Sequence, residues 1–147
     1  MTTETQIVPH NSPEYAQAVD LRKRILRWPL GLDLSPEELA AEFKETHLVA
    51  TQKGKVIGCL VMVPKGEGVV KMRQVAVEPH LQGQGIGVQM VRASEEWARS
   101  AGFARIELSA RDTAVPFYLK LDYALVGEPF EEVTIPHRKM MKVISPA

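Results

Sequence analysis

Apolar residues recur along the chain with two different spacings, which divide it into helices and strands. A helical spacing predicts four helices, at 12–26, 35–43, 86–101 and 113–121. Runs rich in Val, Ile and Leu predict strands, at 5–8, 47–52, 55–64, 69–77 and 104–110, and near 123–130 and 138–144. The resulting order β-α-α-β-β-β-α-β-α-β-β favours a mixed α/β (α+β) fold, in which helices cover both faces of one central sheet.

The first two predicted helices have recognisable start residues. Ser12 followed by Pro13 starts the first, and a capping box of Ser35 and Glu38 starts the second. We expect the first helix to stop before Pro29, because a proline forces the residue before it out of helical geometry. The segment around Pro29 is then a turn rich in apolar side chains.

Length and composition indicate one neutral domain with little cysteine. The 147 residues fall within the size of a single domain, which we expect to span 1–147. Lys and Arg together number 18, as do Asp and Glu, so the overall charge directs the protein neither to nucleic acid nor to an anionic membrane. The single cysteine, Cys59, excludes an intramolecular disulfide framework and is expected to be a buried apolar residue.

Neither the start of the chain nor its apolar runs indicate export or a membrane. The start has no basic segment followed by a long apolar one, as a signal peptide would have. No segment approaches the roughly 18 uninterrupted apolar residues of a membrane-spanning helix. With the single cysteine, these features favour a cytoplasmic protein. The histidines His10, His47 and His80 are scattered, so no metal site is predicted.

Three glycines, Gly83, Gly85 and Gly87, stand at the start of the helix that begins near Ile86. A helix N-terminus has unpaired backbone N–H groups and the positive end of the helix dipole, so it binds anions without a charged side chain. Glycines let an anion approach these N–H groups, because they lack the Cβ atom that would hold it away. The pattern predicts a phosphate-binding loop, and a simple tight turn is the alternative.

Two common phosphate-binding motifs do not fit this spacing. A P-loop requires Gly, four residues, then Gly-Lys-Ser/Thr, and the chain has no such run. A dinucleotide fingerprint requires a glycine three places after Gly85, where this chain has Val88. The loop therefore belongs to neither class.

The arrangement Gln82-x-x-Gly85-x-Gly87 after a strand resembles the pyrophosphate-binding motif Gln/Arg-x-x-Gly-x-Gly/Ala of the GNAT superfamily of acyl-CoA N-acetyltransferases. Residues 108–123 resemble that family's strand and following Phe-Tyr helix, with Asp122-Tyr123 in place of a usual Gly-Phe.

The tail of the chain, 128–141, is similar to the ElaA-like branch of the family, which has an Ile-Pro-His of the same kind. The likeness covers nearly the whole chain. It implies the GNAT fold, with a central, mostly antiparallel mixed sheet of about 6–7 strands.

The resemblance implies acetyl-CoA as the co-substrate and no metal. Backbone N–H groups of the glycine loop would bind the pyrophosphate, and the strand before the loop would bulge and give main-chain groups to the pantetheine arm and the thioester oxygen. Arg111 occupies the place where many relatives have an asparagine near the cofactor, and Phe117 is also a candidate packing residue. The implied cofactor-binding residues are Val75, Ala76, Val77, Gln82, Gly83, Gln84, Gly85, Ile86, Gly87, Val88, Arg111, Phe117 and Tyr118.

The implied reaction is direct attack of a primary amine on the acetyl thioester in a ternary complex. Tyr118 matches the general acid of many family members, which protonates the leaving sulfur, and a core aromatic with a satisfied hydroxyl is the alternative. The family's glutamate before the bulge is missing, because 71–74 reads Lys-Met-Arg-Gln, and Glu78 is expected to face solvent. His137 is the candidate base, in an Ile-Pro-His turn at the acceptor mouth, and a structural histidine is the alternative.

In this family the first helices and the final hairpin shape the acceptor pocket. The basic run of Arg22, Lys23, Arg24 and Arg27 could receive an acidic or phosphorylated acceptor, but most of it is expected on a solvated helix face. The candidate acceptor-side residues are Arg27, Trp28, Gln74 and Glu132. Glu128, Glu131 and Glu132 could instead attract an amine. Because the acceptor-side segments carry both signs of charge, the sequence does not give the charge of the acceptor. The expected partner is a small-molecule or protein amine, with no nucleic acid or membrane, and the fold is compatible with a homodimer through edge strands.

Two further function classes stay open. A GNAT-like module that holds or senses acyl-CoA without turnover is favoured by the missing strand glutamate, whereas Tyr118 favours the enzyme. A protein that binds ATP through the same loop is the third option, and competition between ATP and coenzyme A separates it from the others.

Overall fold

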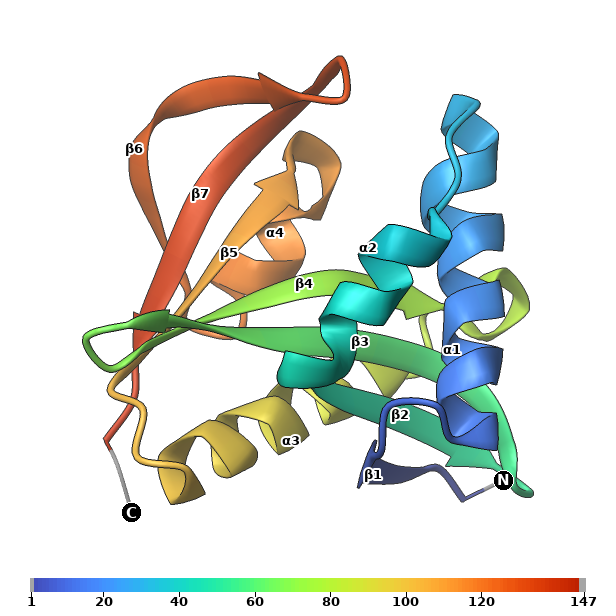
Figure 1. Ribbon diagram of the computed structural model, residues 1–147. Helices are drawn as coiled ribbons and strands as arrows, with labels where there is room; N and C mark the ends of the chain where they lie inside the picture. The colour runs from blue at the N-terminus through green and yellow to red at the C-terminus, as the bar shows by residue number, and fades with distance from the viewer. Residues whose placement is uncertain (1, 146–147) are drawn as a thin grey trace. The chain divides into compact units, whose positions relative to one another are not determined.

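The computed structural model describes residues 2–145 and follows the predicted order of elements (Figure 1). The strands are β1 (Glu4–Val8), β2 (Thr46–Gln52), β3 (Lys55–Gly66), β4 (Val69–Val77), β5 (Arg105–Arg111), β6 (Ala124–Glu132) and β7 (Ile135–Val143). The α-helices are α1 (Pro13–Arg22), α2 (Pro36–Ala41), α3 (Ile86–Ser100) and α4 (Val115–Leu119). Short helical turns are η1 (Lys23–Arg27), η2 (Trp28–Leu30), η3 (Glu42–Lys44), η4 (Pro79–Leu81) and η5 (Asp112–Ala114).

The strands form one seven-stranded mixed sheet in the order β1-β2-β3-β4-β5-β7-β6. β4 and β5 run parallel, whereas β1 with β2, β2 with β3, β5 with β7 and β6 with β7 are antiparallel. The mixed α/β fold that the sequence predicts is confirmed.

The chain divides into two compact units. The N-terminal unit comprises residues up to 63 together with 74–94. The C-terminal unit comprises 64–73 together with the residues from 95 onward. β3, β4 and α3 each contribute residues to both units.

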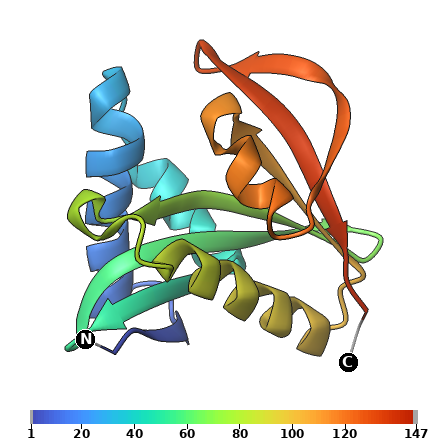
Figure 2. The ribbon, with the colours of Figure 1, turned by 180° about the vertical axis from the view of Figure 1, so that it is seen from behind.

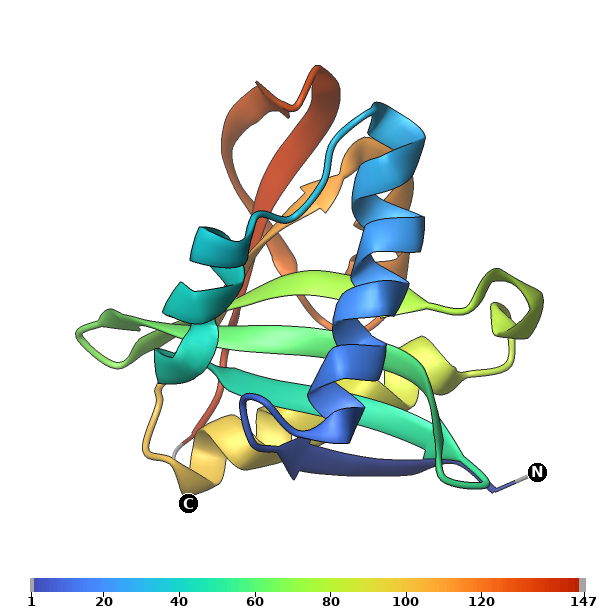
Figure 3. The same ribbon diagram turned by 45° about the vertical axis from the view of Figure 1, so that its right-hand side comes forward.

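In the N-terminal unit, helices lie on both faces of the strands (Figure 3). α1 lies over one face, where Cys59 Sγ is 3.8 Å from the Ala18 carbonyl oxygen. The neighbouring residue, Gly58, faces the first half of α3, and a Cβ placed there would lie 2.9 Å from Met90 Sδ. Cys59 is 1% exposed and burial raises the pKa of its thiol to about 12, so the predicted buried apolar cysteine is confirmed.

In the C-terminal unit, β5 lies between β4 and β7, and β6 follows on the outside. Ile106, Leu108 and Ala110 alternate along β5 and are almost fully buried. α4 lies over one face of these strands, behind β5 in Figure 1 and in front of it in Figure 2. Glu107 and Ser109 alternate with the buried residues, are only half-buried, and point to the other face.

The first α-helix stops before Pro29, as predicted, although the residue before the proline, Trp28, keeps helical angles of φ −57° and ψ −39°. The α-helix ends at Arg22, but η1 and η2 continue the helical path to Leu30. Pro29 lies in the first turn of η2, where a missing backbone N–H leaves no hydrogen bond unmade. Gly31, with φ of 73°, ends the run.

The predicted Ile-Pro-His turn is wrong, because β7 begins at Ile135 and includes His137. The turn of this hairpin lies at Val133 and Thr134, whose φ angles are 47° and 63°. Hairpin turns of this kind favour Asn, Asp and Gly, and β-branched residues rarely adopt positive φ. The sequence therefore has no turn signal at this position.

Candidate functional site

The predicted phosphate-binding loop lies at the start of α3 in the N-terminal unit. The first helical hydrogen bond is donated by Gln89 N to Gly85 O at 3.0 Å, so Gly85 is the N-cap residue. The N–H groups of Ile86, Gly87 and Val88 consequently have no helical carbonyl to bind. Gly85 has no side chain to accept them, and these donors stand at the positive end of the helix dipole.

The backbone and the space around this loop suit an anionic ligand. Gly83 and Gly85 have φ of 83° and 84°, a conformation that side chains rarely adopt. A Cβ added at either position would meet no atom within 4 Å, so the space beside the loop is open. Gln82 Nε2 donates to Val77 O at 3.3 Å and thereby ties the loop to the end of β4.

β4 leaves ordinary strand geometry at Gln74, directly before the residues expected to bind pantetheine. Gln74 has φ of 57°, and the parallel register with β5 ends earlier, at Met72. Its Oε1 is buried and has no hydrogen-bond partner within residues 2–145. Of the three residues that follow, Ala76 is buried, whereas Val75 and Val77 are half-buried. A non-glycine residue with positive φ is a mark of local strain, and strain of this kind concentrates at functional sites.

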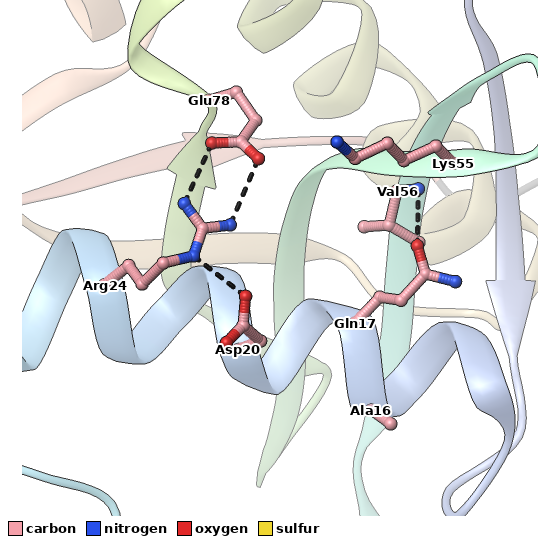
Figure 4. Close-up of a pocket in the computed structure, with 7 residues that line it drawn as sticks. All are labelled: Ala16, Gln17, Asp20, Arg24, Lys55, Val56 and Glu78. Atoms are coloured by element: carbon pink, nitrogen blue, oxygen red, sulfur yellow. Dashed lines mark hydrogen bonds and ion pairs between the residues drawn. The ribbon is translucent and has the colours of Figure 1, made fainter.

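The prediction that Glu78 faces solvent was wrong, because this residue is paired with Arg24 of η1. It is 7% exposed, and its two carboxylate oxygens accept hydrogen bonds from Arg24 Nη1 and Nη2 at 3.1 Å each (Figure 4). These hydrogen bonds hold the pKa of Glu78 below its ordinary value. Glu78 is therefore a fixed anion at the entry to the loop rather than a candidate base.

A hollow of about 520 Å³ surrounds this ion pair in the N-terminal unit. Its lining is Ala16, Gln17, Asp20, Arg24, Lys55, Val56 and Glu78 (Figure 4). The polar groups here bind one another: Arg24 Nε donates to Asp20 at 2.8 Å, and Gln17 Oε1 accepts from Val56 N at 3.0 Å. None of the predicted site residues lines this hollow. Its contacts hold the residue after β4, Glu78, against η1, and hold β3 against α1.

Arg22 is buried rather than on a solvated face, which corrects the prediction at this residue of the basic run. It is 1% exposed, and its guanidinium donates to both carboxylate oxygens of Glu42, which also accepts from the Tyr15 hydroxyl at 2.7 Å. Burial alone would raise the pKa of Glu42, but the hydrogen bonds from Arg22 and Tyr15 outweigh it and hold the pKa below its ordinary value.

The predicted acceptor-side residues fall in both units. Arg27, Trp28 and Gln74 belong to the N-terminal unit, and Glu132 belongs to the C-terminal unit. Trp28 is 50% exposed, and its Nε1 donates to Asp33 Oδ1 at 3.2 Å. Arg27 is half-buried in η1, and its Nη1 donates to a backbone carbonyl.

Tyr118 lies in α4 of the C-terminal unit and is 6% exposed. Its ring contacts those of Phe117 and Tyr123 edge-on, at centroid distances of 5.0 Å and 5.8 Å. Burial raises the pKa of Tyr118 to about 12, so its hydroxyl keeps its proton at neutral pH. That is the protonation state a general acid requires.

His137 lies in β7, opposite Arg111 of β5 in the sheet register. Its Nδ1 is 2.7 Å from Ile135 O, and a carbonyl oxygen only accepts, so Nδ1 carries the proton in the neutral ring. The lone pair is then on Nε2, which lies 3.8 Å from Glu132 Oε2. The structure thus brings together three predicted site residues, Arg111, Glu132 and His137, in the C-terminal unit.

Neither a metal centre nor a membrane span is found in the part of the chain that the structure describes. Within residues 2–145 no three His, Cys, Asp or Glu side chains are grouped so that they would hold a metal ion. None of the helices in this range is both long and apolar enough to cross a bilayer.

An open, glycine-flanked helix start that follows an irregular strand of a mixed sheet is typical of the anion-binding sites of α/β proteins. The chain belongs to the acetyltransferase (GNAT) family, whose sequence model matches residues 15–123. This confirms the predicted GNAT-type N-acetyltransferase class. The ElaA-like branch stays a prediction, because the match does not separate the branches of the family.

Similar proteins share the fold over nearly the whole chain. The uncharacterised N-acetyltransferase YjcF of Bacillus subtilis (strain 168) is 26% identical over 137 residues, which are 92% of this chain and 97% of that protein. A Lactobacillus plantarum protein assigned as an N-acetyltransferase has a TM-score of 0.87 at 24% identity, with 98% of this chain and 99% of that one covered. An aminoglycoside 6'-N-acetyltransferase solved in complex with coenzyme A has a TM-score of 0.82 at 20% identity, with 98% of each chain covered.

Proposed function

We propose that the protein transfers an acetyl group from acetyl-CoA to a primary amine of a small molecule or a protein, by direct attack in a ternary complex. The observation that carries this proposal is the open start of α3, where Gly83 and Gly85 expose backbone N–H groups at the positive end of a helix dipole. The aminoglycoside 6'-N-acetyltransferase of similar fold, which binds coenzyme A, supports the choice of donor.

Each part of the donor has a proposed partner in the chain. The N–H groups along 83–88 bind the pyrophosphate, because those of Ile86–Val88 lack helical partners and the space beside Gly83 and Gly85 is open. The N–H of Gln82 already donates to Pro79 O at 3.3 Å. Main-chain groups of Val75 and Val77, after the strained Gln74, bind the pantetheine arm. Arg111 and Phe117 remain proposed contacts at the cofactor.

The proposed reaction forms one bond and breaks one. The acceptor nitrogen bonds to the thioester carbonyl carbon, while a main-chain N–H of β4 stabilises the negative charge that grows on the carbonyl oxygen. The carbon–sulfur bond then breaks, and Tyr118 gives its proton to the leaving sulfur. His137 Nε2 takes the proton that the amine loses, and Glu132 stabilises the resulting imidazolium.

Release of free thiol from acetyl-CoA across a panel of primary amines tests this proposal. We expect release that depends on the amine and that falls strongly in Tyr118→Phe, while coenzyme A binds both proteins equally. A protein that does not bind coenzyme A, or that releases thiol at the same rate without any amine, would contradict it.

A second candidate is a module that binds or senses acyl-CoA without turnover. It is favoured by one observation: 71–74 offers no carboxylate where many family members have a catalytic glutamate. Tight binding of coenzyme A without turnover of any amine would establish this candidate, and displacement of coenzyme A by ATP would indicate a nucleotide-binding protein. A homodimer through edge strands and a cytoplasmic location also stay proposals.

A further inference from the structure

One face of the strands in the C-terminal unit carries an excess of positive charge. It is the face opposite α4, toward which the residues that alternate with buried Leu108 point. The sheet register places Lys71 beside Glu107, and His137 beside Arg111, on this face. We call it the basic face; its charged residues are Lys71, Arg73, Arg105, Glu107, Arg111, Glu132, His137 and Lys139.

The two carboxylates of the basic face already have partners. Glu107 lies 3.7 Å from Arg105 Nε and 3.6 Å from Lys139 Nζ. Glu132 lies 3.8 Å from His137 Nε2 and forms an ion pair with it when the imidazole is protonated. Lys71 and Arg73 form no ion pair with any acid within residues 2–145.

Lys71 is the cation that gains most from an added anion, because it is half-buried. Burial lowers the pKa of its ammonium, and the nearby Arg73 lowers it further. Lys65 acts in the same direction, whereas Glu132 and Glu107 act in the opposite one. A partly desolvated cation beside another cation is stabilised when an anion binds between them.

Resting on the proposed function, we infer that the acceptor is a small amine that carries a carboxylate or a phosphate group, and that Lys71 and Arg73 bind this group. The same face carries His137 and Glu132, the proposed base and its partner, so an acceptor bound there has its anionic end at β4 and its amine at β7, two strands separated by β5. Arginine binds both anions through two parallel hydrogen bonds, and lysine binds them as a point charge.

Matched pairs of acceptors test this inference. Thiol release from acetyl-CoA is measured with ethanolamine phosphate against ethanolamine, and with 4-aminobutyrate against its amide. We expect kcat/KM to be at least about tenfold higher for the anionic member of at least one pair, since a hydrogen bond to a charged group contributes roughly that factor. The two pairs separate a phosphate from a carboxylate.

Variants then assign the preference to these residues. Lys71→Met and Arg73→Gln are each expected to raise KM for the anionic acceptor about tenfold and to leave KM for the neutral acceptor unchanged. Lys120→Met, which removes an exposed lysine at the end of α4, is the matched control and should keep the preference.

Equal or better turnover of the neutral acceptors would overturn the inference and leave the proposed function standing. An unchanged preference in both variants would overturn it too. If no amine is acetylated, the proposed function fails, and calorimetric titration with ethanolamine phosphate still tests the basic face. Binding that is absent, or equal in wild type and the Lys71→Met and Arg73→Gln double variant, would then contradict the anion site.

Discussion

The starts of α2 and α3, both in the N-terminal unit, are built in opposite ways. At α2, Ser35 Oγ accepts from Glu38 N at 3.1 Å, and Glu38 Oε1 accepts in return from Ser35 N at 3.5 Å. At α3, Gly85 is the N-cap and has no side chain to accept the helix's free N–H groups. α1 resembles α2, because Ser12 Oγ accepts from Tyr15 N at 3.1 Å.

The capped starts of α1 and α2 contribute to stability, whereas the uncapped start of α3 is the one proposed to bind a ligand. A capping serine contributes about 1 kcal/mol to stability, because it satisfies donors that would otherwise rely on water. The chain uses this stabilisation at α1 and α2 and omits it at α3. The free donors of α3 are available to the anion that we propose binds there, so changes at the two helix starts should have separable effects.

Gly85→Asp should produce the largest effect, since it gives α3 a side chain that accepts its N–H groups and repels a pyrophosphate. The loss of about two hydrogen bonds to a charged ligand predicts a Kd for coenzyme A about 1,000-fold higher, measured by calorimetry. Gly54→Asp is the matched control, because Gly54 has φ of 77° and similar open space. Both variants should lose about 1–2 kcal/mol of stability through backbone strain. Equal affinity losses in the two would contradict the account.

Glu42→Gln tests the C-terminal end of α2, where the buried carboxylate of Glu42 accepts hydrogen bonds from Arg22 and Tyr15. Breaking the buried pair with Arg22 should lower the free energy of unfolding by about 3 kcal/mol and leave coenzyme A affinity unchanged. The pKa of Glu42 lies below its ordinary 4.5, so the pair stabilises fully above that value and its contribution is lost as pH falls through the lower folded pKa. Urea unfolding of both proteins at neutral and acidic pH measures this. A variant as pH-sensitive as wild type would refute the assignment.

Tyr118→Phe separates chemistry from binding. Loss of a general acid should lower kcat about 100-fold, while the affinity for coenzyme A stays the same. Because the pKa of Tyr118 is raised to about 12, kcat should not fall with rising pH up to about pH 10, the ordinary value for a tyrosine. Tyr123→Phe is the matched control, since it removes a neighbouring buried hydroxyl that donates to Glu95 at 3.0 Å. Similar kcat values in both variants would remove Tyr118 from the mechanism.

Ser35→Ala should have the smallest effect. It removes the capping box of α2 and should lower the free energy of unfolding by about 1 kcal/mol, as thermal or urea unfolding would show. Coenzyme A affinity should not change, because α2 is not proposed to bind the donor. A weakened affinity would mean that the two helix starts are not independent.

Local signals allowed the sequence to predict the helix starts. Ser12, Ser35 and Gly85 are each followed within four residues by the N–H groups that a helix start leaves free. The local sequence therefore shows whether a side chain caps these groups. The same holds for the order of the strands along the chain, because most strands have their own short run rich in Val, Ile or Leu. The roles of Tyr118 and His137 remain predictions.

Pairings between distant segments were not predictable. Arg22 and Glu42 are 20 residues apart, and Arg24 and Glu78 are 54 apart, so only the folded chain shows that they bind each other. The basic face was hidden for the same reason. Lys71 and Glu107 look like unrelated charges until the register of β4 with β5 places them together.

The central claim is that the free N–H groups at the start of α3 bind the pyrophosphate of the donor. Titration of coenzyme A into labelled protein, followed by NMR of the backbone amides, tests it most directly. The account predicts that the amide signals of Ile86, Gly87 and Val88 move on saturation, while those of Glu37 and Glu38 in the capped α2 stay in place. Saturable binding that leaves the signals of 83–88 unmoved would contradict it.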